Sequence, residues 1–270
     1  MGRGSALSRS PVDRDPARIE EMFDRIAGRY DLMNRAMTFG LDGRWRRLAA
    51  AQAQPRPGDK LLDVCCGTGD LALTLHAVHP YSAVTGLDFS EAMLARARRK
   101  AGAADGAPSG PLHFVRGDAL ALPFADGEFA AVTVGWGVRN VPDVPRVFIE
   151  MARVTRPGGR VVCLEMTPVR SPLTRPLHTL WLGRAVPALG RLVAGDAAAY
   201  SYLPASVAAF PDAEELAAIM HGAGLRNVRY RRLGLGALAL HVGEVPDTTL
   251  ATGSGEAAGP GGTGRPEPGP

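Results

Sequence analysis

The chain has 270 residues, 46% of them hydrophobic and 21% charged, so it can bury a full globular core. Its net charge of +4 comes almost entirely from arginine, and the arginine pairs are scattered, unlike the dense basic stripe of a nucleic-acid-binding protein. The three cysteines, all in predicted strands, lack metal-ligand spacing, and no apolar run approaches the roughly 18 residues of a membrane span. We therefore expect a cytoplasmic protein that binds no metal and at most touches the inner face of the membrane.

Helical segments precede the first predicted strand. Residues 1–15 are polar and predicted to be flexible, and residues 18–29 then show apolar residues at helical spacing. A second amphipathic stretch covers residues 30–53, and the breaker Pro-Arg-Pro-Gly-Asp at 55–59 separates it from the sheet region. We expect residues 16–54 to form a helical cap.

From residue 60 onward the chain alternates strand and helix patterns, which predicts an α/β fold with a mostly parallel seven-stranded sheet and helices on both faces. An apolar insertion at 171–210 interrupts the alternation and has the character of a lid. The last two strands are expected to finish the sheet as an antiparallel edge. The single domain ends near residue 245, and the Gly/Pro-rich tail at 246–270 is predicted to be disordered. Strands are expected at 60–66, 82–87, 112–117, 129–135, 159–165, 226–232 and 237–244, and helices at 70–78, 90–101, 143–154 and 212–223.

A glycine turn joins the first of these strands to the next helix. The apolar run at 61–64 leads into Cys65-Cys66-Gly67-Thr68-Gly69, and an amphipathic segment comes next. Gly67 and Gly69 allow a sharp turn and a close backbone approach to a ligand. Because Gly67-x-Gly69-x-x-Ala72 also matches the dinucleotide fingerprint, an NAD oxidoreductase is one alternative, and a βα turn without a ligand is another.

Acidic residues favour S-adenosylmethionine over NAD. Asp88 ends the second strand, where a carboxylate can bind the ribose hydroxyls of either molecule. Asp70 begins the helix, where it would repel a pyrophosphate but suit the cationic ammonium and sulfonium of S-adenosylmethionine. Asp118 follows the third strand and can accept the exocyclic amine of adenine, although such a residue alone is as well explained as a loop cap. The ordered set Asp63, Gly67, Gly69, Asp88 and Asp118 predicts a methyltransferase.

Three further segments carry a family resemblance over residues 18–245. They are Tyr30-Asp31-Leu32-Met33-Asn34, Gly135-Trp136-Gly137-Val138-Arg139-Asn140-Val141, and Arg153-Val154-Thr155-Arg156-Pro157-Gly158-Gly159 with Leu164-Glu165. With them the chain resembles the menaquinone and ubiquinone biosynthesis C-methyltransferases, and most of all the demethylmenaquinone methyltransferase family. It departs from the commoner pattern by Thr38 in place of serine and Asp42 in place of histidine. The resemblance implies the Rossmann-like fold of class I S-adenosylmethionine-dependent methyltransferases.

The resemblance also implies roles for individual residues. Cofactor contacts are expected at Thr68, Asp88, Asp118, Ala119 and Gly135, with Gly67 and Gly69 beneath the methionine part. Tyr30, Arg139 and Asn140 are expected to face a quinol ring, although Arg139 and Asn140 could instead pin a loop and Tyr30 could be a core aromatic. His178, His221 and His241 are alternative bases, of which His241 lies in an apolar strand and is better explained as structural.

The implied reaction is C-methylation of demethylmenaquinol to menaquinol, with a deprotonated hydroxyl making the adjacent ring carbon nucleophilic. We expect a base to act directly or through a water held by Arg139 and Asp118. Expected partners are a prenylated naphthoquinol, a membrane surface and, in a homodimer, a second copy. The alternatives are ubiquinone-pathway benzoquinol C-methylation (alone or in addition), another small-molecule methyltransferase, and a non-catalytic S-adenosylmethionine-binding partner. A nucleic-acid methyltransferase is disfavoured, because no Asn-Pro-Pro-aromatic site for a flipped base occurs.

Overall fold

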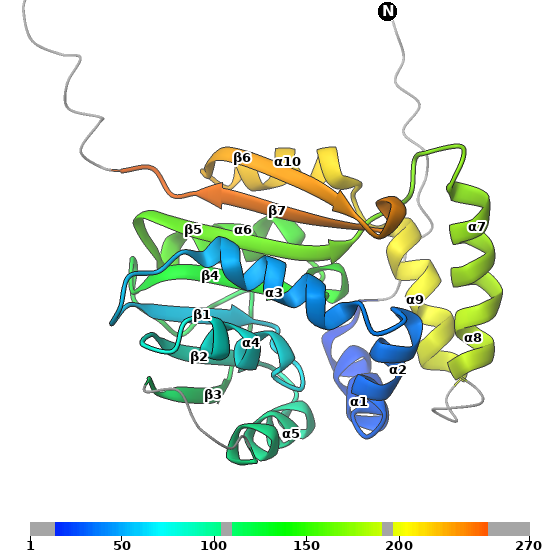
Figure 1. The fold of residues 1–270 in the computed structure, drawn as a ribbon, viewed down its shortest axis with the longest axis horizontal. Helices are drawn as coiled ribbons and strands as arrows, with labels where there is room; N and C mark the ends of the chain where they lie inside the picture. Colours follow the sequence, from blue (N-terminus) through cyan, green and yellow to red (C-terminus); the bar gives the residue numbers. More distant parts are fainter. Residues whose placement is uncertain (1–13, 104–109, 191–196, 248–270) are drawn as a thin grey trace, which may run out of the picture.

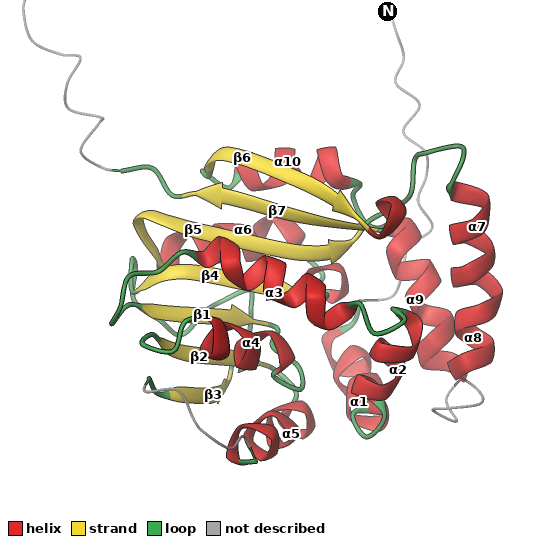
Figure 2. Cartoon of the chain, in the orientation of Figure 1, coloured by secondary structure: helices red, strands yellow, loops and turns green. Residues whose placement is uncertain are grey.

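The computed structural model describes residues 14–103, 110–190 and 197–247, which fold around one seven-stranded sheet (Figures 1 and 2). The strand order is β3-β2-β1-β4-β5-β7-β6. Neighbouring pairs among β1 to β5 are parallel, whereas β7 is antiparallel to both β5 and β6. The strands are β1 (Lys60–Val64), β2 (Ala83–Asp88), β3 (Leu112–Arg116), β4 (Phe129–Gly135), β5 (Thr155–Met166), β6 (Arg226–Leu233) and β7 (Leu238–Glu244).

Helices cover both faces of this sheet, as the alternating pattern predicts (Figure 1). Apolar side chains of α3 and α4 pack on one face, and those of α6 and α10 pack on the other. The helices are α1 (Pro16–Ile26), α2 (Tyr30–Met37), α3 (Asp42–Ala53), α4 (Asp70–Val78), α5 (Glu91–Gly102), α6 (Val144–Val154), α7 (Arg175–Leu180), α8 (Val186–Leu189), α9 (Ala197–Ala209) and α10 (Ala213–Gly222), with short η1 (Val138–Asn140), η2 (Trp181–Ala185) and η4 (Gly234–Gly236).

The last two strands finish the sheet with antiparallel pairing, as the sequence predicts: β7 lies between β5 and β6, and β6 is the edge strand. One feature of the helical cap is not evident from the sequence. The amphipathic stretch at 30–53 is two helices, because the chain turns between α2 and α3 at Phe39 and Gly40, which have φ values of 53° and 74°.

A helical cap stands over the end of the sheet at which the parallel strands terminate (Figure 1). Its small core joins helices α1 and α2 to η2, α8 and α9. The N-terminal cap segment and the insertion at 171–210 are thus far apart in the sequence but pack together. The buried side chains of this core are Ile19, Met22, Ile26, Met33, Leu182, Val186, Leu203 and Val207.

The two tails predicted to be flexible, 1–15 and 246–270, lie almost entirely outside the described residues. Within the described part of the chain, every helix is too short or too polar to cross a bilayer. A group of three or more potential metal-ligating side chains does not occur there either.

Candidate active site

The glycine turn between β1 and α4 has the left-handed backbone conformation that its two glycines predict. Gly67 and Gly69 have φ values of 54° and 82°. A Cβ at Gly69 would lie 2.8 Å from the Cβ of Ala97 and 3.0 Å from the ring of Phe114, so only glycine fits beneath α5 and β3. A Cβ at Gly67 would meet nothing within 4 Å, and this glycine borders open space.

A cavity of about 250 Å³ lies against this turn at the ends of β1, β2 and β4; we call it the first cavity. It is lined by most of the residues for which the sequence predicts cofactor contacts: Asp63, Gly67, Thr68, Asp88, Asp118, Ala119 and Gly135. Gly69 is not among the lining residues, because it faces Ala97 and Phe114 below the turn. Gly69 instead determines the shape of the turn.

Asp63 places a buried carboxylate at this cavity. The side chain is only 1% exposed, and its Oδ1 accepts a hydrogen bond of 2.7 Å from Thr133 Oγ1. Its Oδ2 has no hydrogen-bond partner among the described residues. Burial raises the pKa of this carboxyl to about 7. A cationic group in the cavity would satisfy Oδ2 and favour the ionised form.

Asp88 connects the end of β2 to the glycine turn. Its Oδ2 accepts the backbone N–H of Gly67 at 2.8 Å, and its Oδ1 accepts the backbone N–H of Ser90 at 3.0 Å. Burial raises the pKa of Asp88 to about 6, although the two backbone donors oppose this shift. Each oxygen keeps a further lone pair, so the carboxylate can hold the turn and still accept a ligand hydroxyl.

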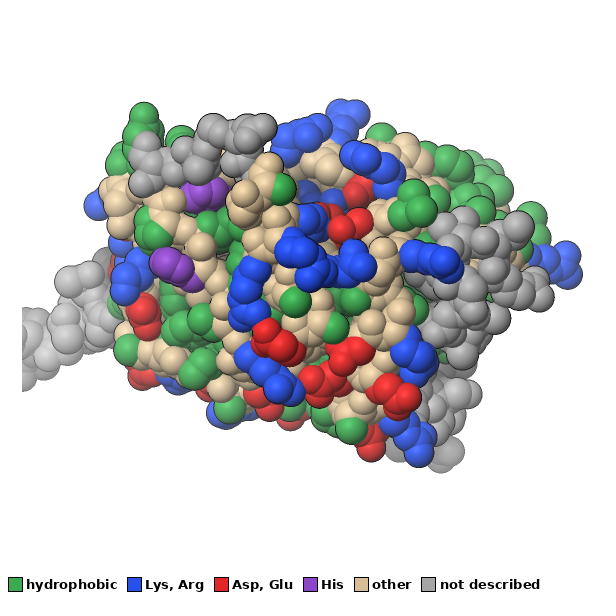
Figure 3. Space-filling view, turned by 90° about the horizontal axis from the view of Figure 1, so that it is seen from below, with side chains coloured by type: hydrophobic (Ala, Val, Ile, Leu, Met, Phe, Trp, Pro, Cys, Tyr) green, Lys and Arg blue, Asp and Glu red, His purple; other side chains and the backbone are tan. Residues whose placement is uncertain are grey.

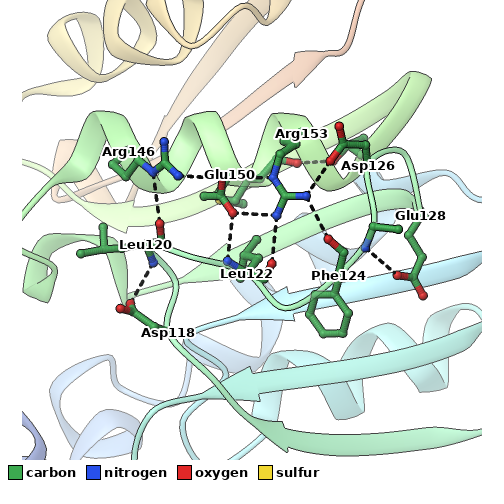
Figure 4. Close-up of polar contacts among 12 residues, drawn as sticks. Asp118, Leu120, Leu122, Phe124, Asp126, Glu128, Arg146, Glu150 and Arg153 are labelled. Carbon is green, nitrogen blue, oxygen red and sulfur yellow. Dashed lines mark hydrogen bonds and ion pairs between the residues drawn. The ribbon is translucent and has the colours of Figure 1, made fainter.

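The loop that carries Asp118 and Ala119 is held by α6 (Figure 4). Glu150 of α6 accepts the backbone N–H of Leu122 at 2.9 Å, and Arg153 donates to the carbonyl of Leu122 at 2.9 Å. Asp118 Oδ1 accepts the backbone N–H of Leu120 at 2.8 Å within the loop. The position of the loop at the cavity is therefore fixed by a helix on the far face of the sheet.

Asp70, at the start of α4, belongs to a network of charged side chains. Lys100 of α5 forms ion pairs with Asp70 and with Asp31 of α2, and it donates to Thr68 Oγ1 at 3.1 Å. Arg46 of α3 lies 3.1 Å from the second oxygen of Asp70. Asp70 is therefore not a free negative charge that would repel a pyrophosphate, because two cations offset it. The network ties the cap to the glycine turn.

A second cavity of about 440 Å³ lies between the cap and the sheet. It is mostly apolar, and its lining comes from α1, α2, α3, α7, η2, α9 and the η4 turn. Five residues line both cavities, namely Phe23, Tyr30, Asn34, Trp136 and Asn140. A ligand in the first cavity and another in the second would therefore meet at these residues.

Arg139, a predicted catalytic residue, lines the second cavity but not the first. It is 7% exposed, and its Nη1 lies 2.8 Å from Glu165 Oε1, a carboxylate that is fully buried. Its Nε has no acceptor among the described residues. Burial by itself lowers the pKa of Arg139, but the charge and hydrogen bond of Glu165, together with the two tyrosines nearby, raise it overall, so the guanidinium stays charged. Asp118, its expected partner in holding a water, lines only the first cavity.

Asn140 and Trp136 lie where the cavities meet. Asn140 Nδ2 donates to the carbonyl of Trp136 at 3.5 Å, whereas its Oδ1 is buried without a partner among the described residues. Trp136 has a φ of 58°, a value that costs a bulky residue about 1 kcal/mol or more and that occurs often at functional sites. The strained turn aims its carbonyl at Arg139 Nη1, 2.5 Å away.

Tyr30, at the start of α2, lines both cavities, as its predicted role requires. Burial raises the pKa of its hydroxyl, although the charge of Arg139 opposes this shift. The hydroxyl therefore keeps its proton at neutral pH and can donate a hydrogen bond.

The three candidate histidines are separated by the fold. His178 of α7 lines the second cavity, and its Nε2 is buried without a partner among the described residues. His221 of α10 hydrogen-bonds the carbonyl of Leu225, and His241 of β7 hydrogen-bonds that of Ala213, both away from the cavities. Burial lowers the pKa of His241 to about 4, consistent with the structural role that its apolar strand indicates.

Several lining residues carry no functional signal in the sequence. Cys65 and Cys66 follow β1, although the sequence pattern predicts them inside the strand, and both line the first cavity. Arg46 and Trp136 also line it and contact each other, with the guanidinium 5.0 Å from the ring centre. The unusual pair Thr38 and Asp42 is linked by a hydrogen bond of 3.2 Å, and both residues line the second cavity.

The first cavity fits S-adenosylmethionine. The unpartnered Asp63 Oδ2 suits its ammonium group, and Gly67 leaves space for a ligand against the backbone. Asp88 and Asp118 stand on the next two strand ends, where ribose and adenine would extend along the edge of the sheet.

Comparisons with known proteins agree with this geometry. A family model described as the ubiE/COQ5 methyltransferase family matches residues 12–245. The demethylmenaquinone methyltransferase of Thermus thermophilus is 46% identical over 225 residues, which are 83% of this chain and 100% of the relative. The protein of that name from Deinococcus radiodurans is 44% identical over 244 residues, covering 89% and 99%. The ubiquinone/menaquinone biosynthesis C-methyltransferase UbiE of Desulfotalea psychrophila is 44% identical over 225 residues, covering 83% and 89%.

Solved structures share the fold at low identity. A SAM-dependent methyltransferase from Thermotoga maritima has a TM-score of 0.58 at 20% identity and covers 84% of this chain and 99% of its own. Phosphoethanolamine N-methyltransferase 2 of Haemonchus contortus, solved with S-adenosylhomocysteine, has a TM-score of 0.57 at 14% identity, covering 85% and 60%. The fold class predicted from the strand and helix pattern is thereby confirmed.

Proposed function

Because this chain belongs to the ubiE/COQ5 methyltransferase family, we propose that it methylates a ring carbon of demethylmenaquinol and so produces menaquinol. It is an S-adenosylmethionine-dependent C-methyltransferase by family and fold. The observation that carries the proposal is the junction of a cavity lined by the carboxylates of Asp63 and Asp88, suited to the methyl donor, with a larger apolar cavity, suited to a prenylated ring. Two reactants must meet within bonding distance, and Tyr30, Trp136 and Asn140 line the place where they can.

The first cavity holds the methyl donor in this proposal. Asp63 pairs with the ammonium group, Asp88 accepts the ribose hydroxyls, and Asp118 accepts the adenine amine. When bound, S-adenosylmethionine supplies an electrophilic methyl group. The glycine turn, Ala119 and Gly135 shape the site around it, and Gly69 keeps the turn in place.

The second cavity makes the ring carbon nucleophilic. Loss of a hydroxyl proton to a water molecule puts negative charge on the quinol oxygen and, through the ring, on the adjacent carbon. This carbon takes the methyl group and then loses its own proton, which restores the aromatic ring. The guanidinium of Arg139, which lines this cavity, stabilises the negative charge. Asn140 Oδ1 accepts a hydrogen bond from the other ring hydroxyl and orients the ring, and Tyr30 donates a hydrogen bond. Apolar walls exclude water.

The mouth of the second cavity supports contact with a membrane surface. Of the ten large apolar side chains that are exposed in the described residues, six surround this mouth. Four of them line the cavity itself, so a prenyl tail could pass from a bilayer directly into the site. The six are Phe39, Leu41, Leu173, Leu177, Leu180 and Leu235, with exposed fractions between 43% and 89%.

The charge around this mouth suits an anionic lipid surface. Residues 167–190 contain no aspartate or glutamate but three exposed arginines, of which Arg170 pairs with Asp212 and Glu215, and Arg175 and Arg184 lie on α7 and η2. Hydrophobic side chains gather at the right-hand end of the molecule in Figure 3, where Figure 1 draws α7 and α8. We therefore include peripheral docking of this face on a bilayer in the proposed function.

A direct test supplies the purified protein with methyl-labelled S-adenosylmethionine and lipid extracts from a mutant that lacks quinone methylation. One labelled methyl on the ring of a prenylated naphthoquinone is the expected product. Label on a benzoquinone precursor would instead support the ubiquinone pathway, which the name of the Desulfotalea relative includes. Label on any other metabolite would overturn the proposal.

A further inference from the structure

Glu165 is a fully buried carboxylate behind the second cavity. It ends the apolar part of β5, and it lines neither cavity. Its Oε1 accepts from Arg139 Nη1 at 2.8 Å and from the backbone N–H of Met166 at 2.8 Å. Its Oε2 lies 3.3 Å from the backbone nitrogen of Arg139. One carboxylate thus binds both the side chain and the backbone of Arg139.

These contacts leave Arg139 in one orientation. Its Nη1 is shared between Glu165 and the carbonyl of Trp136, whereas its Nε has no partner among the described residues. Rotation of the guanidinium would break both of these bonds. The orientation of Arg139, which lines the second cavity, is therefore fixed by Glu165 and by the carbonyl of Trp136.

We propose that Glu165 is a positioning residue for methyl transfer, which fixes the guanidinium of Arg139 at the second cavity and offsets its charge before the quinolate forms. The inference rests on the proposed function, because it assigns Glu165 a part in the same reaction. Glu165 itself does not contact the substrate.

The energetics of buried ion pairs support a functional reason for this one. Two charges taken out of water gain little over a well-packed apolar pair, so stability alone gives weak grounds for placing Arg139 and Glu165 here. The pair is neutral in the resting site, and a quinolate adds one negative charge beside it. Other groups whose charge acts on Arg139 or which line the same cavity are Tyr30 of α2, Asp42 of α3, Tyr202 of α9 and His178 of α7.

The substitution Glu165→Gln tests the carboxylate of Glu165 without changing the size of the side chain. It keeps the volume of the side chain but removes the charge that offsets Arg139. The excess positive charge then stabilises a bound oxyanion, so we expect the bound ring hydroxyl to ionise at a pH lower by on the order of one unit. Because the amide no longer fixes the guanidinium, kcat should fall by about tenfold or more.

The first measurement needs no turnover. 1-Naphthol bound in the second cavity is titrated, and its ionisation is read from its absorbance in the wild-type protein and in Glu165→Gln. Glu150 provides a control, because it is also a buried carboxylate, 4% exposed, that binds an arginine, the partly exposed Arg153, and it does not line the second cavity. Glu150→Gln should reduce stability without moving the ionisation of the bound naphthol.

The second measurement is the pH profile of kcat. In Glu165→Gln the acid limb of the profile should shift to lower pH while kcat falls. Glu165→Asp keeps the charge but has a shorter side chain, so kcat should fall while the acid limb stays at its wild-type pH. A folded Glu165→Gln protein with wild-type kcat and an unmoved limb would overturn the proposal. If Glu165→Gln does not fold, wild-type kcat in Glu165→Asp overturns it. Failure of the proposed function would be seen differently, because the wild-type protein itself would then methylate no quinol.

Discussion

The two cavities differ in the parts of the chain that line them. The first lies mostly on strand ends and on the loops after them, within a sheet whose register is fixed by neighbouring strands, and residues of α1 and α2 complete it. The second lies under the cap, between helices from two distant parts of the sequence. Buried carboxylates line the first cavity, whereas the second is more apolar and has the Arg139–Glu165 ion pair at its wall.

This difference separates the sheet, which other methyltransferases share, from the cap. Methyltransferases that share about 20% identity with this chain share its sheet, and therefore the strand ends that form the first cavity. In the proposed function the donor binds at the strand ends and the acceptor under the cap, and the two assignments can be tested independently.

Asn140→Leu tests the junction and should have the largest effect. The substitution removes the unpartnered Oδ1 from the place where both cavities meet, and we expect kcat to fall by about 10²- to 10³-fold. Stability should change by less than about 1 kcal/mol, because a buried oxygen without a donor is also removed. Turnover and thermal unfolding measure the two effects. An unchanged kcat would show that Asn140 only pins its loop.

Gly69→Ala should damage the first cavity selectively. The new Cβ would overlap Ala97 and would stand at a φ of 82°, so we expect a loss of about 2–4 kcal/mol in stability and weaker binding of S-adenosylhomocysteine. Gly58→Ala is the matched control, since its φ is 87° but nothing lies within 4 Å of the added atom. Equal losses in the two variants, by calorimetry, would contradict the steric explanation.

The pH dependence of cofactor binding tests Asp63. Its pKa of about 7 means that most molecules hold a proton there at pH 6, and an ammonium group binds the ionised form. Affinity for S-adenosylhomocysteine should therefore fall by up to about tenfold per pH unit below pH 7. Asp63→Asn should remove this dependence. A wild-type affinity that is constant between pH 5.5 and 8 would place the ammonium elsewhere.

The same raised pKa affects folding, with a definite sign. Between about pH 4 and 7 the native carboxyl of Asp63 keeps a proton that the unfolded chain has lost, so the free energy of unfolding of the ligand-free protein falls as pH rises. Asp63→Asn should flatten this part of the stability curve, measured by denaturant titration at several pH values.

Leu177→Ser tests the mouth of the second cavity and should have the smallest effect. Leu177 is 64% exposed on α7, and its loss should weaken vesicle binding by about fivefold, since a leucine side chain contributes on the order of 1–2 kcal/mol when buried in lipid. Leu32→Ser is the control, because Leu32 is 58% exposed but does not line the second cavity. Flotation with anionic liposomes compares them. Equal flotation of both variants and the wild type would count against the docking face.

The first cavity could be predicted from the sequence because its residues are local. Gly67, Asp88 and Asp118 each lie at the end of a recognisable strand, and parallel strands bring their carboxyl ends to one edge. The second cavity could be predicted only in outline, as a helical cap and a lid-like insertion, since its shape depends on how the turn at Phe39 and the helix at Leu177 pack across a long separation. Glu165 is 26 residues from Arg139, and its signals in the sequence, an acid near the end of an apolar strand and a place in a segment that carries the family resemblance, do not reveal its contact with Arg139.

A structure of the protein with S-adenosylhomocysteine and a prenylated naphthoquinol tests the central claim most directly. We expect the ring to lie where the two cavities join, with a ring oxygen hydrogen-bonded to Arg139 and the carbon next to it facing the cofactor sulfur past Asn140 and Trp136. The prenyl tail should leave between Phe39, Leu177 and Leu235. A ring bound outside this junction, or one whose oxygens do not contact Arg139 or Asn140, would contradict the claim.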